Sequence, residues 1–264
     1  MSPRWPSQEE VIEMAERRVV RFRLTALAIV LALGCMSGAF ALPAQAQPVF
    51  PPPVDPYDPH IDPADFVAVI DNPYMPLTPG TTYTYEGAFK AEGEEITVTV
   101  TNRTKRIIGI TTTVVSDVVT VDGELAEKTF DWYAQDRWGN VWYFGEDTKT
   151  YENGKVVSTE GSWEAGVDGA KPGIVMLGEP HVGDTYRQEY YPGVAEDMAQ
   201  VIELGASVTV PFGSFDEVLV TQDWTPLEPK MLEYKYYAPG IGLVLERSAK
   251  GPKEEVQLVS VDLK

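Results

Sequence analysis

The chain has few of the residues and motifs on which most catalytic sites depend. Histidine occurs only at His60 and His181, so neither a Ser-His-Asp triad nor a multi-histidine metal site is expected. The glycine motifs of hydrolase elbows, phosphate-binding loops and dinucleotide-binding folds are absent, as is the zinc-protease HExxH motif. The sequence therefore predicts no catalytic residue, no metal site and no cofactor. Calcium bound by carboxylates stays an alternative, although no EF-hand loop is present.

Cysteine is limited to Cys35, which lies in the apolar run 24–41. Arginines precede this run and Ala44-Gln45-Ala46 follows it, which is the order of a secretory signal peptide with an A-x-A cleavage site. We predict a signal peptide over residues 1–46, cleavage after Ala46, and a secreted or periplasmic protein without a membrane span. Lipid attachment at Cys35 is the alternative, which the apolar residues beyond it disfavour. The pair Arg17-Arg18 leaves the choice between Sec and twin-arginine export open.

Basic residues are scarce, with 21 Lys and Arg against 40 Asp and Glu and a net charge of −19. Cleavage after Ala46 would leave 16 basic and 36 acidic residues, a net charge of 16 − 36 = −20. A nucleic-acid partner is not expected, because binding to phosphates requires Lys and Arg. The 218 remaining residues (264 − 46) contain no cysteine, so they must be stabilised by a buried core.

A proline-rich segment over residues 47–63 predicts an extended linker, because proline fixes φ and removes backbone donors. Asp62 followed by Pro63 has the order of a helix N-cap and a first helical residue. We therefore predict one short N-terminal helix from Pro63 to about Ile70, which Asn72-Pro73 ends.

The rest of the chain, residues 64–264, is predicted to be a single all-β domain, because Val, Thr, Tyr and Trp alternate with polar residues between turn signals. This pattern indicates an antiparallel sandwich or a barrel or half-barrel. The predicted strands cover residues 95–100, 107–115, 118–121, 125–134, 141–144, 201–210, 218–222, 231–237, 243–247 and 255–263.

Two parts of this domain resemble each other. Gly80 precedes Gly109 by 29 positions and Gly183 precedes Gly213 by 30, and in both cases a Tyr-Ala pair begins 24 positions after the second glycine. The spacing predicts two pseudo-repeats, at about 76–146 and 180–247, with an insert at 147–179. Frequent Gly, Thr and Tyr in β-proteins are the alternative explanation.

The segment FDWYAQDRWGNVWYFGE, residues 130–146, predicts a hairpin with a type I turn and a glycine in the left-handed region, so that Asp136 pairs with Asn140. Alternation then predicts two faces. The predicted core face carries Phe130, Trp132, Ala134, Trp142, Phe144 and Glu146. The other face carries Asp131, Tyr133, Gln135 and Tyr143, which together with Trp163 in the insert form the predicted ligand-binding set. An ordinary hydrated sheet face, with Trp163 covering a sheet edge, is the alternative.

The phrases NPYMPLTPGTTYTYEG, DWYAQDRWGNVWYFGE, SWEAGVDGAKPGIVM and EYKYYAPGIGLVLE resemble those of a group of exported bacterial proteins, over most of residues 66–246. The resemblance implies an exported all-β protein and no particular activity. The closing YYAPGIGLVLE is also similar to the last strands of periplasmic half-barrel proteins that shelter apolar ligands.

These observations favour an exported, non-catalytic β-domain that binds a small molecule, a glycan or an envelope partner. One alternative is a carboxylate-dependent hydrolase acting on a glycan, with a pair such as Asp131 and Glu146. Another is a purely structural or interaction domain. The sequence makes no prediction of the oligomeric state.

Overall fold

The structure is a computed structural model that describes residues 56–87, 93–251 and 254–263. The predicted signal peptide and Cys35 lie outside the described residues, as does most of the predicted linker. None of the helices in these ranges has the length and apolar composition that crossing a membrane requires.

The described chain forms one antiparallel sheet. Its strands are β1 (Phe66–Val67), β2 (Thr81–Gly87), β3 (Glu94–Ile107), β4 (Ile110–Val121), β5 (Glu124–Asp136), β6 (Val141–Glu152), β7 (Lys155–Ser158), β8 (Trp163–Glu164), β9 (Lys171–Met176), β10 (Thr185–Arg187), β11 (Glu189–Tyr190), β12 (Met198–Val210), β13 (Gly213–Trp224), β14 (Leu232–Ala238), β15 (Gly242–Lys250) and β16 (Glu255–Leu263). Their order is β10-β12-β13-β14-β15-β16-β2-β3-β4-β5-β6-β9-β11, while β1 pairs with β5, and β7 and β8 pair with β6.

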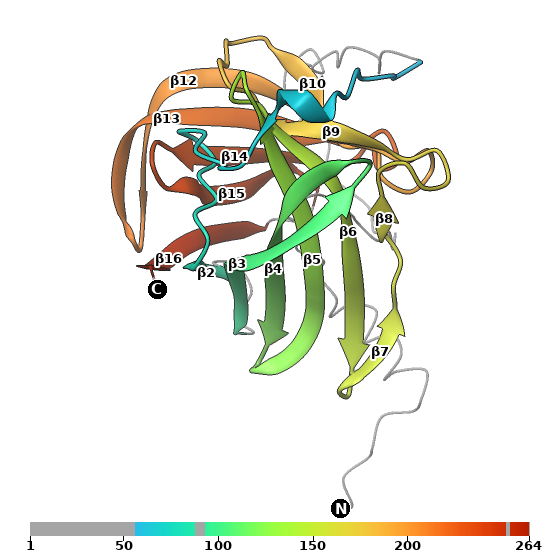
Figure 1. Cartoon of the computed structure of the whole chain (residues 1–264). Coiled ribbons are helices and arrows are strands. Elements are labelled where there is room, and N and C mark those ends of the chain that lie inside the picture. Colours follow the sequence, from blue (N-terminus) through green and yellow to red (C-terminus); the bar gives the residue numbers. More distant parts are fainter. Residues whose placement is uncertain (1–55, 88–92, 252–253, 264) are drawn as a thin grey trace, which may run out of the picture.

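This path of strands curls into a nearly closed barrel (Figure 1). The path starts at β10 and ends at β11, and only Gln188 separates these two strands in the sequence. The segment from Thr185 to Tyr190 therefore pairs with β12 at its beginning and with β9 at its end. The predicted all-β antiparallel fold is confirmed, in the barrel form.

The predicted helix from Pro63 to Ile70 is wrong. Only a 3-10 turn, η1 (Pro63–Asp65), forms, with Asp62 Oδ1 accepting a hydrogen bond from the Ala64 backbone at 2.9 Å. Asp62 and Pro63 therefore form the N-cap and first residue of this turn, as predicted. The backbone becomes extended at Phe66, whose φ is −92° and ψ 140°. Phe66 pairs with Asp136 in β5 and its ring lies 5.6 Å from that of Phe144, so tertiary packing prevails over local helix propensity.

The strand order is the same in two successive stretches of chain. Strands β2 to β6 are neighbours in sequence order, with β9 beside β6, and β10 is followed by β12 to β15, with β16 beside β15. Strand β16 then pairs with β2, and β9 pairs with β11, which joins the two stretches on both sides. Residues 147–179 contribute the end of β6 and strands β7, β8 and β9 to the sheet.

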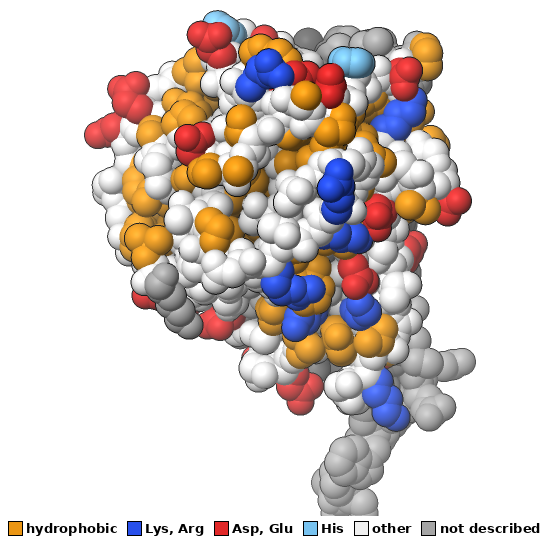
Figure 2. Space-filling model, in the orientation of Figure 1, with side chains coloured by type: hydrophobic (Ala, Val, Ile, Leu, Met, Phe, Trp, Pro, Cys, Tyr) orange, Lys and Arg blue, Asp and Glu red, His pale blue; other side chains and the backbone are white. Residues whose placement is uncertain are grey.

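The buried residues include many polar and charged side chains beside the apolar core. Buried carboxyl groups belong to Glu94, Asp117, Glu127, Asp131, Asp136, Glu146, Glu189, Asp197, Asp223 and Glu246, and the buried cations are Arg187 and Lys235. By contrast, Lys and Arg side chains lie over strands β4 to β6 on the outer surface, among apolar side chains (Figure 2). Burial of so many acids is costly unless they are protonated, hydrogen-bonded or paired.

Candidate functional site

A β-bulge in the β5–β6 hairpin determines which side chains meet inside the barrel. The turn forms as predicted, with the Asp136 backbone N donating to Asn140 O at 3.0 Å, and Tyr133 pairs with Tyr143. Beyond this pair the register shifts by one residue, so that Asp131 lies opposite Glu146 rather than Gly145. The predicted placement of Glu146 on the other face is therefore wrong.

Gly145 is the residue that permits the shift. Its φ is +123°, and a Cβ at this position would lie 2.2 Å from the backbone oxygen of Trp163. Only glycine tolerates both this conformation and this close approach. An isolated glycine within a strand is a known signal of a bulge, and it could have placed Glu146 beside Asp131 in advance.

Four of the five predicted ligand-binding residues form one buried cluster, which we call the β5–β6 cluster. The Tyr143 hydroxyl donates to Asp131 Oδ1 at 2.7 Å, and the Tyr133 and Tyr143 rings stack with centroids 4.9 Å apart. The Trp163 ring meets the Tyr143 ring edge-on at 5.4 Å, and its Nε1 donates to Glu189 Oε2 at 3.0 Å. Sequence reasoning brought these aromatic residues together but did not identify Glu189.

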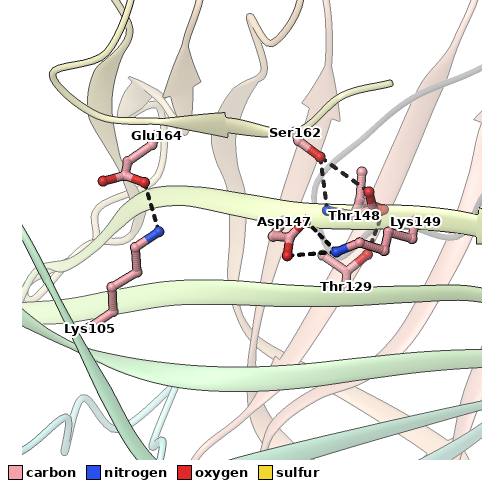
Figure 3. Close-up of polar contacts among 7 residues, drawn as sticks. All are labelled: Lys105, Thr129, Asp147, Thr148, Lys149, Ser162 and Glu164. Atoms are coloured by element: carbon pink, nitrogen blue, oxygen red, sulfur yellow. Dashed lines mark hydrogen bonds and ion pairs between the residues drawn. The ribbon is translucent and has the colours of Figure 1, made fainter. Parts of the chain in front are cut away.

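The residues on each side of Trp163 fix its position against β6. Ser162 Oγ accepts a hydrogen bond from the Thr148 backbone N at 3.0 Å and lies 3.2 Å from Thr148 O (Figure 3). Glu164 forms an ion pair with Lys105 of β3 at 2.7 Å. Trp163 pairs with Glu146 in the ladder and is 4% exposed, so it is part of the core rather than a loop residue open to solvent.

Gln135 does not belong to this cluster. Its Oε1 accepts hydrogen bonds from the backbone N of Asp71 at 2.9 Å and of Asn72 at 2.8 Å. Its Nε2 donates to Asp71 Oδ1 at 2.7 Å. Gln135 thus fastens the segment that follows β1 to β5, which is a structural position.

The predicted core face of the hairpin is covered by other residues. Trp132 is 6% exposed, with Lys105 Nζ 3.2 Å from its ring centroid, and Trp142 donates from Nε1 to Asp136 Oδ2 at 2.9 Å. Phe144 is fully buried and packs on Phe66. Both faces of the hairpin are therefore largely buried, one of them against the polar cluster.

Asp117 on β4 adds a further carboxyl group to the β5–β6 cluster. Burial raises its pKa well above the usual value, and the nearby carboxylates of Asp131, Glu127 and Glu146 raise it further. Its Oδ1 is buried without a hydrogen-bond partner. Burial, together with the carboxylates of Asp131 and Glu146, also raises the pKa of Tyr133 and of Tyr143, so both phenols stay protonated.

A second buried polar group surrounds Lys235 of β14, and we call it the β14–β15 cluster. Lys235 Nζ lies 3.4 Å from Asp223 Oδ2 and 3.8 Å from Glu246 Oε2. Burial lowers the pKa of Lys235, but the carboxylates of Glu246 and Asp223 outweigh this effect and hold it well above the usual value. The ammonium therefore stays charged.

The two clusters occupy corresponding register positions. In β5–β6, Asp131 lies opposite Glu146 and two residues before Tyr133, which pairs with Tyr143. In β14–β15, Lys235 lies opposite Glu246 and two residues before Tyr237, and a bulge again separates these pairs. Asp117 and Asp223 lie on the strands on the other side. Asp117 pairs with Thr129, two residues before Asp131. Asp223 pairs with Glu233, two residues before Lys235, so the two aspartates occupy corresponding positions. The lysine position of one cluster is thus an aspartate in the other.

The described residues contain no group of three or more His, Cys, Asp or Glu side chains arranged to hold a metal ion. The β5–β6 cluster offers carboxyl groups beside aromatic rings.

No protein-family model matches the chain. No curated protein matches it either. It has structural matches among bacterial proteins whose descriptions state no activity. One is a "putative exported protein with YmcC-like fold" from Bacteroides fragilis NCTC 9343, with 15% identity, a TM-score of 0.43, and coverage of 72% of this chain and 98% of that chain. Another is a "putative lipoprotein" from Parabacteroides distasonis ATCC 8503, with 14% identity, a TM-score of 0.41 and the same coverage.

Proposed function

We propose that the protein is an exported, non-catalytic barrel that binds a small organic amine at the β5–β6 cluster. The observation that carries this proposal is the exchange of Lys235 for Asp131 at corresponding positions. In the β14–β15 cluster, an ammonium group of the chain itself lies beside Asp223 and Glu246. The corresponding positions of the β5–β6 cluster carry Asp117, Asp131 and Glu146, and the proposal assigns the place of the Lys235 ammonium there to the ammonium of a ligand.

The aromatic residues support the same class of ligand. Tyr143 contacts Asp131 through its hydroxyl and lies against the rings of Tyr133 and Trp163. Aromatic faces attract cations and stack on sugar rings. An amino sugar uses both features, because its ring packs on aromatic surface and its ammonium pairs with a carboxylate. This class falls within the ligands expected from the sequence, which are a small molecule, a glycan or an envelope partner.

The proposal includes an internal duplication of the barrel, with units at about 76–146 and 180–247. The common strand order and the corresponding clusters support it. In this account the two units diverged at this position, with a lysine in one unit and an aspartate in the other.

Three sugars share one ring and differ at one position. Glucosamine has a free amine there, N-acetylglucosamine has an uncharged amide and glucose has a hydroxyl. We expect only glucosamine to raise the Tm, by about 2–4 °C at ten times its Kd. Because Tyr133 and Tyr143 are almost fully covered, neighbouring residues must move, and we expect slow association. Equal shifts with all three sugars would contradict the amine site.

Two variants locate the response. Asp131→Asn removes one carboxylate with little change in shape and should abolish the glucosamine shift, whereas Asp262→Asn at an exposed position should keep it. A shift that survives Asp131→Asn places the binding elsewhere on the acidic chain.

A glycan hydrolase is the second candidate, because the bulge makes Asp131 and Glu146 direct cross-strand partners. Opposed residues have Cβ atoms about 4.5–5.5 Å apart, and retaining glycosidases use carboxyl groups about 5–5.5 Å apart. Release of nitrophenol from a panel of nitrophenyl glycosides, lost in Glu146→Gln, would favour this candidate over the non-catalytic one.

A further inference from the structure

Arg187, at the end of β10, is a buried cation. Its exposed fraction is 5%, and its Nη1 is buried without a hydrogen-bond partner. Among the residues that the structure describes, no ion pair joins its guanidinium to a carboxylate. In a chain with 40 acidic residues, this isolation is unexpected.

Two other cations of the protein differ from Arg187 in this respect. Lys235, which is also buried, lies beside Asp223 and Glu246. Arg137, which like Arg187 lies against an aromatic ring, forms an ion pair with Asp65. Removing a guanidinium from water without a partner is costly, so a buried arginine with an unsatisfied nitrogen indicates a missing anion.

The surroundings of Arg187 are aromatic and cationic. Its guanidinium carbon lies 5.4 Å from the ring centroid of Tyr57 and 4.7 Å from that of Tyr190. These two rings lie 5.4 Å apart. Lys171, the cross-strand partner of Tyr190, donates from Nζ to Tyr57 O at 2.5 Å and to Asp58 Oδ1 at 3.0 Å. Tyr57 thus contacts both cations, while Asp58 is largely exposed, with 83% of its side chain accessible.

We propose that Arg187, with Tyr57, Tyr190 and Lys171, forms a binding site for the oxyanion of a small ligand, a carboxylate or a phosphate. The tyrosine rings lie against the guanidinium, and its Nη1 remains to donate hydrogen bonds to the oxyanion, for which a planar guanidinium is well suited. Lys171 supplies a second positive charge when its ion pair with the exposed Asp58 breaks. Tyr57 covers the site from the N-terminal segment, so this segment must shift when the ligand enters.

This site is separate from the amine site of the β5–β6 cluster, and sugars of the same size distinguish them. Glucuronate carries the carboxylate, glucose 6-phosphate carries the phosphate, and glucose carries neither. At equal ionic strength, we expect glucuronate or glucose 6-phosphate to raise the Tm of the full chain by about 2–4 °C at ten times its Kd, and glucose to have no effect. The ligand that acts identifies the oxyanion.

Arg187→Met keeps the length of the side chain and removes its charge, so it should abolish the shift. Arg137→Met is the matched control, since Arg137 also lies against an aromatic ring but has its own carboxylate, and the shift should persist. Absence of a shift with both oxyanions, an equal shift with glucose, or a shift that survives Arg187→Met would each overturn the proposal.

If Arg187→Met does not fold, hydrogen exchange of the wild-type chain with and without the oxyanion tests the site instead. We expect the effective oxyanion to slow exchange in the peptides that contain Tyr57 and Arg187 and to leave the β4–β5 turn unchanged. Unchanged exchange in both peptides at a saturating concentration would also overturn the proposal.

Discussion

The Tyr143 hydroxyl donates a hydrogen bond of 2.7 Å to Asp131 Oδ1, linking two positions that lie diagonally across the β5–β6 ladder. Both residues are almost fully buried, at 0% and 3% exposed. The contact therefore holds a carboxylate in place inside the barrel and keeps the stacked tyrosine pair at a fixed distance from it.

Tyr143→Phe tests how much this hydrogen bond contributes to the free energy of unfolding. The change removes the donor and leaves a buried carboxylate oxygen with one hydrogen bond fewer, so we expect a loss of about 1–3 kcal/mol in the free energy of unfolding. Tyr151→Phe, at a half-buried position near the end of the same strand, should cost less than about 0.5 kcal/mol. Urea denaturation of the two variants provides the comparison, and equal losses would contradict a specific role for the Tyr143 hydroxyl.

Asp117→Asn is expected to stabilise the protein at neutral pH. Because the pKa of Asp117 is raised in the folded chain, the contribution of Asp117 to stability is fully present below its unfolded pKa of about 3.9 and is lost as the pH rises through the folded pKa. The asparagine cannot ionise, so the variant should have a higher free energy of unfolding than the wild type at pH 7.

Tm values of both proteins between pH 4 and pH 8 measure this difference, which should shrink toward pH 4. Asp262→Asn, at an exposed position, is the control and should change the Tm little at any pH. A gain for Asp117→Asn that does not depend on pH would show that ionisation is not its cause.

The local features of this fold were predictable from sequence, and the long-range ones were not. Alternating Thr, Val and Tyr indicated strands, and Asp136 to Asn140 indicated the turn that forms. Closure of the barrel depends on the segment around Gln188, which pairs with two strands distant from each other in the path. Because no local pattern encodes such a pairing, sequence left the sandwich and the barrel equally open.

Which of the candidate residues lie together could likewise be predicted only in part. Alternation correctly grouped Asp131 with Tyr133 and Tyr143, because these residues lie within one regular hairpin. It missed Glu146, since a one-residue bulge reverses the face of every residue beyond it. Alternation placed Gln135 on the same face as Asp131, but the Gln135 amide accepts a hydrogen bond from the Asp71 backbone N. These residues are 64 positions apart, and alternation within a hairpin cannot predict such a contact.

Lys235→Met should destabilise the protein strongly. The change leaves the carboxyl groups of Asp223 and Glu246 buried without their cation, and loss of one partner of a buried ion pair costs about 3–5 kcal/mol. The half-exposed Lys105, which pairs with Glu164, is the matched control, and Lys105→Met should cost at most about 1 kcal/mol. Adding Glu246→Gln to Lys235→Met should restore part of the stability in chemical denaturation, and no recovery would argue against charge as the cause.

Gly145→Ala tests whether the bulge assembles the β5–β6 cluster. An alanine would require φ near +123° and would place its Cβ 2.2 Å from the Trp163 backbone oxygen, so β8 must move away from β6. We expect a loss of about 3 kcal/mol or more, together with loss of the response to glucosamine. Gly123→Ala separates the two effects, because Gly123 also has a positive φ, of +79°, but has no atom within 4 Å of an added Cβ.

The control variant should lose only about 1–2 kcal/mol, the cost of the left-handed conformation, and should keep the full glucosamine shift. Intrinsic fluorescence adds a local measurement, because Trp163 is held between Tyr143 and Glu189 and should change its emission when β8 moves. If Gly145→Ala and Gly123→Ala lose the same stability and both keep the response, the close contact with Trp163 does not position the site. In that case Asp131 and Glu146 must be brought together by the surrounding ladder alone.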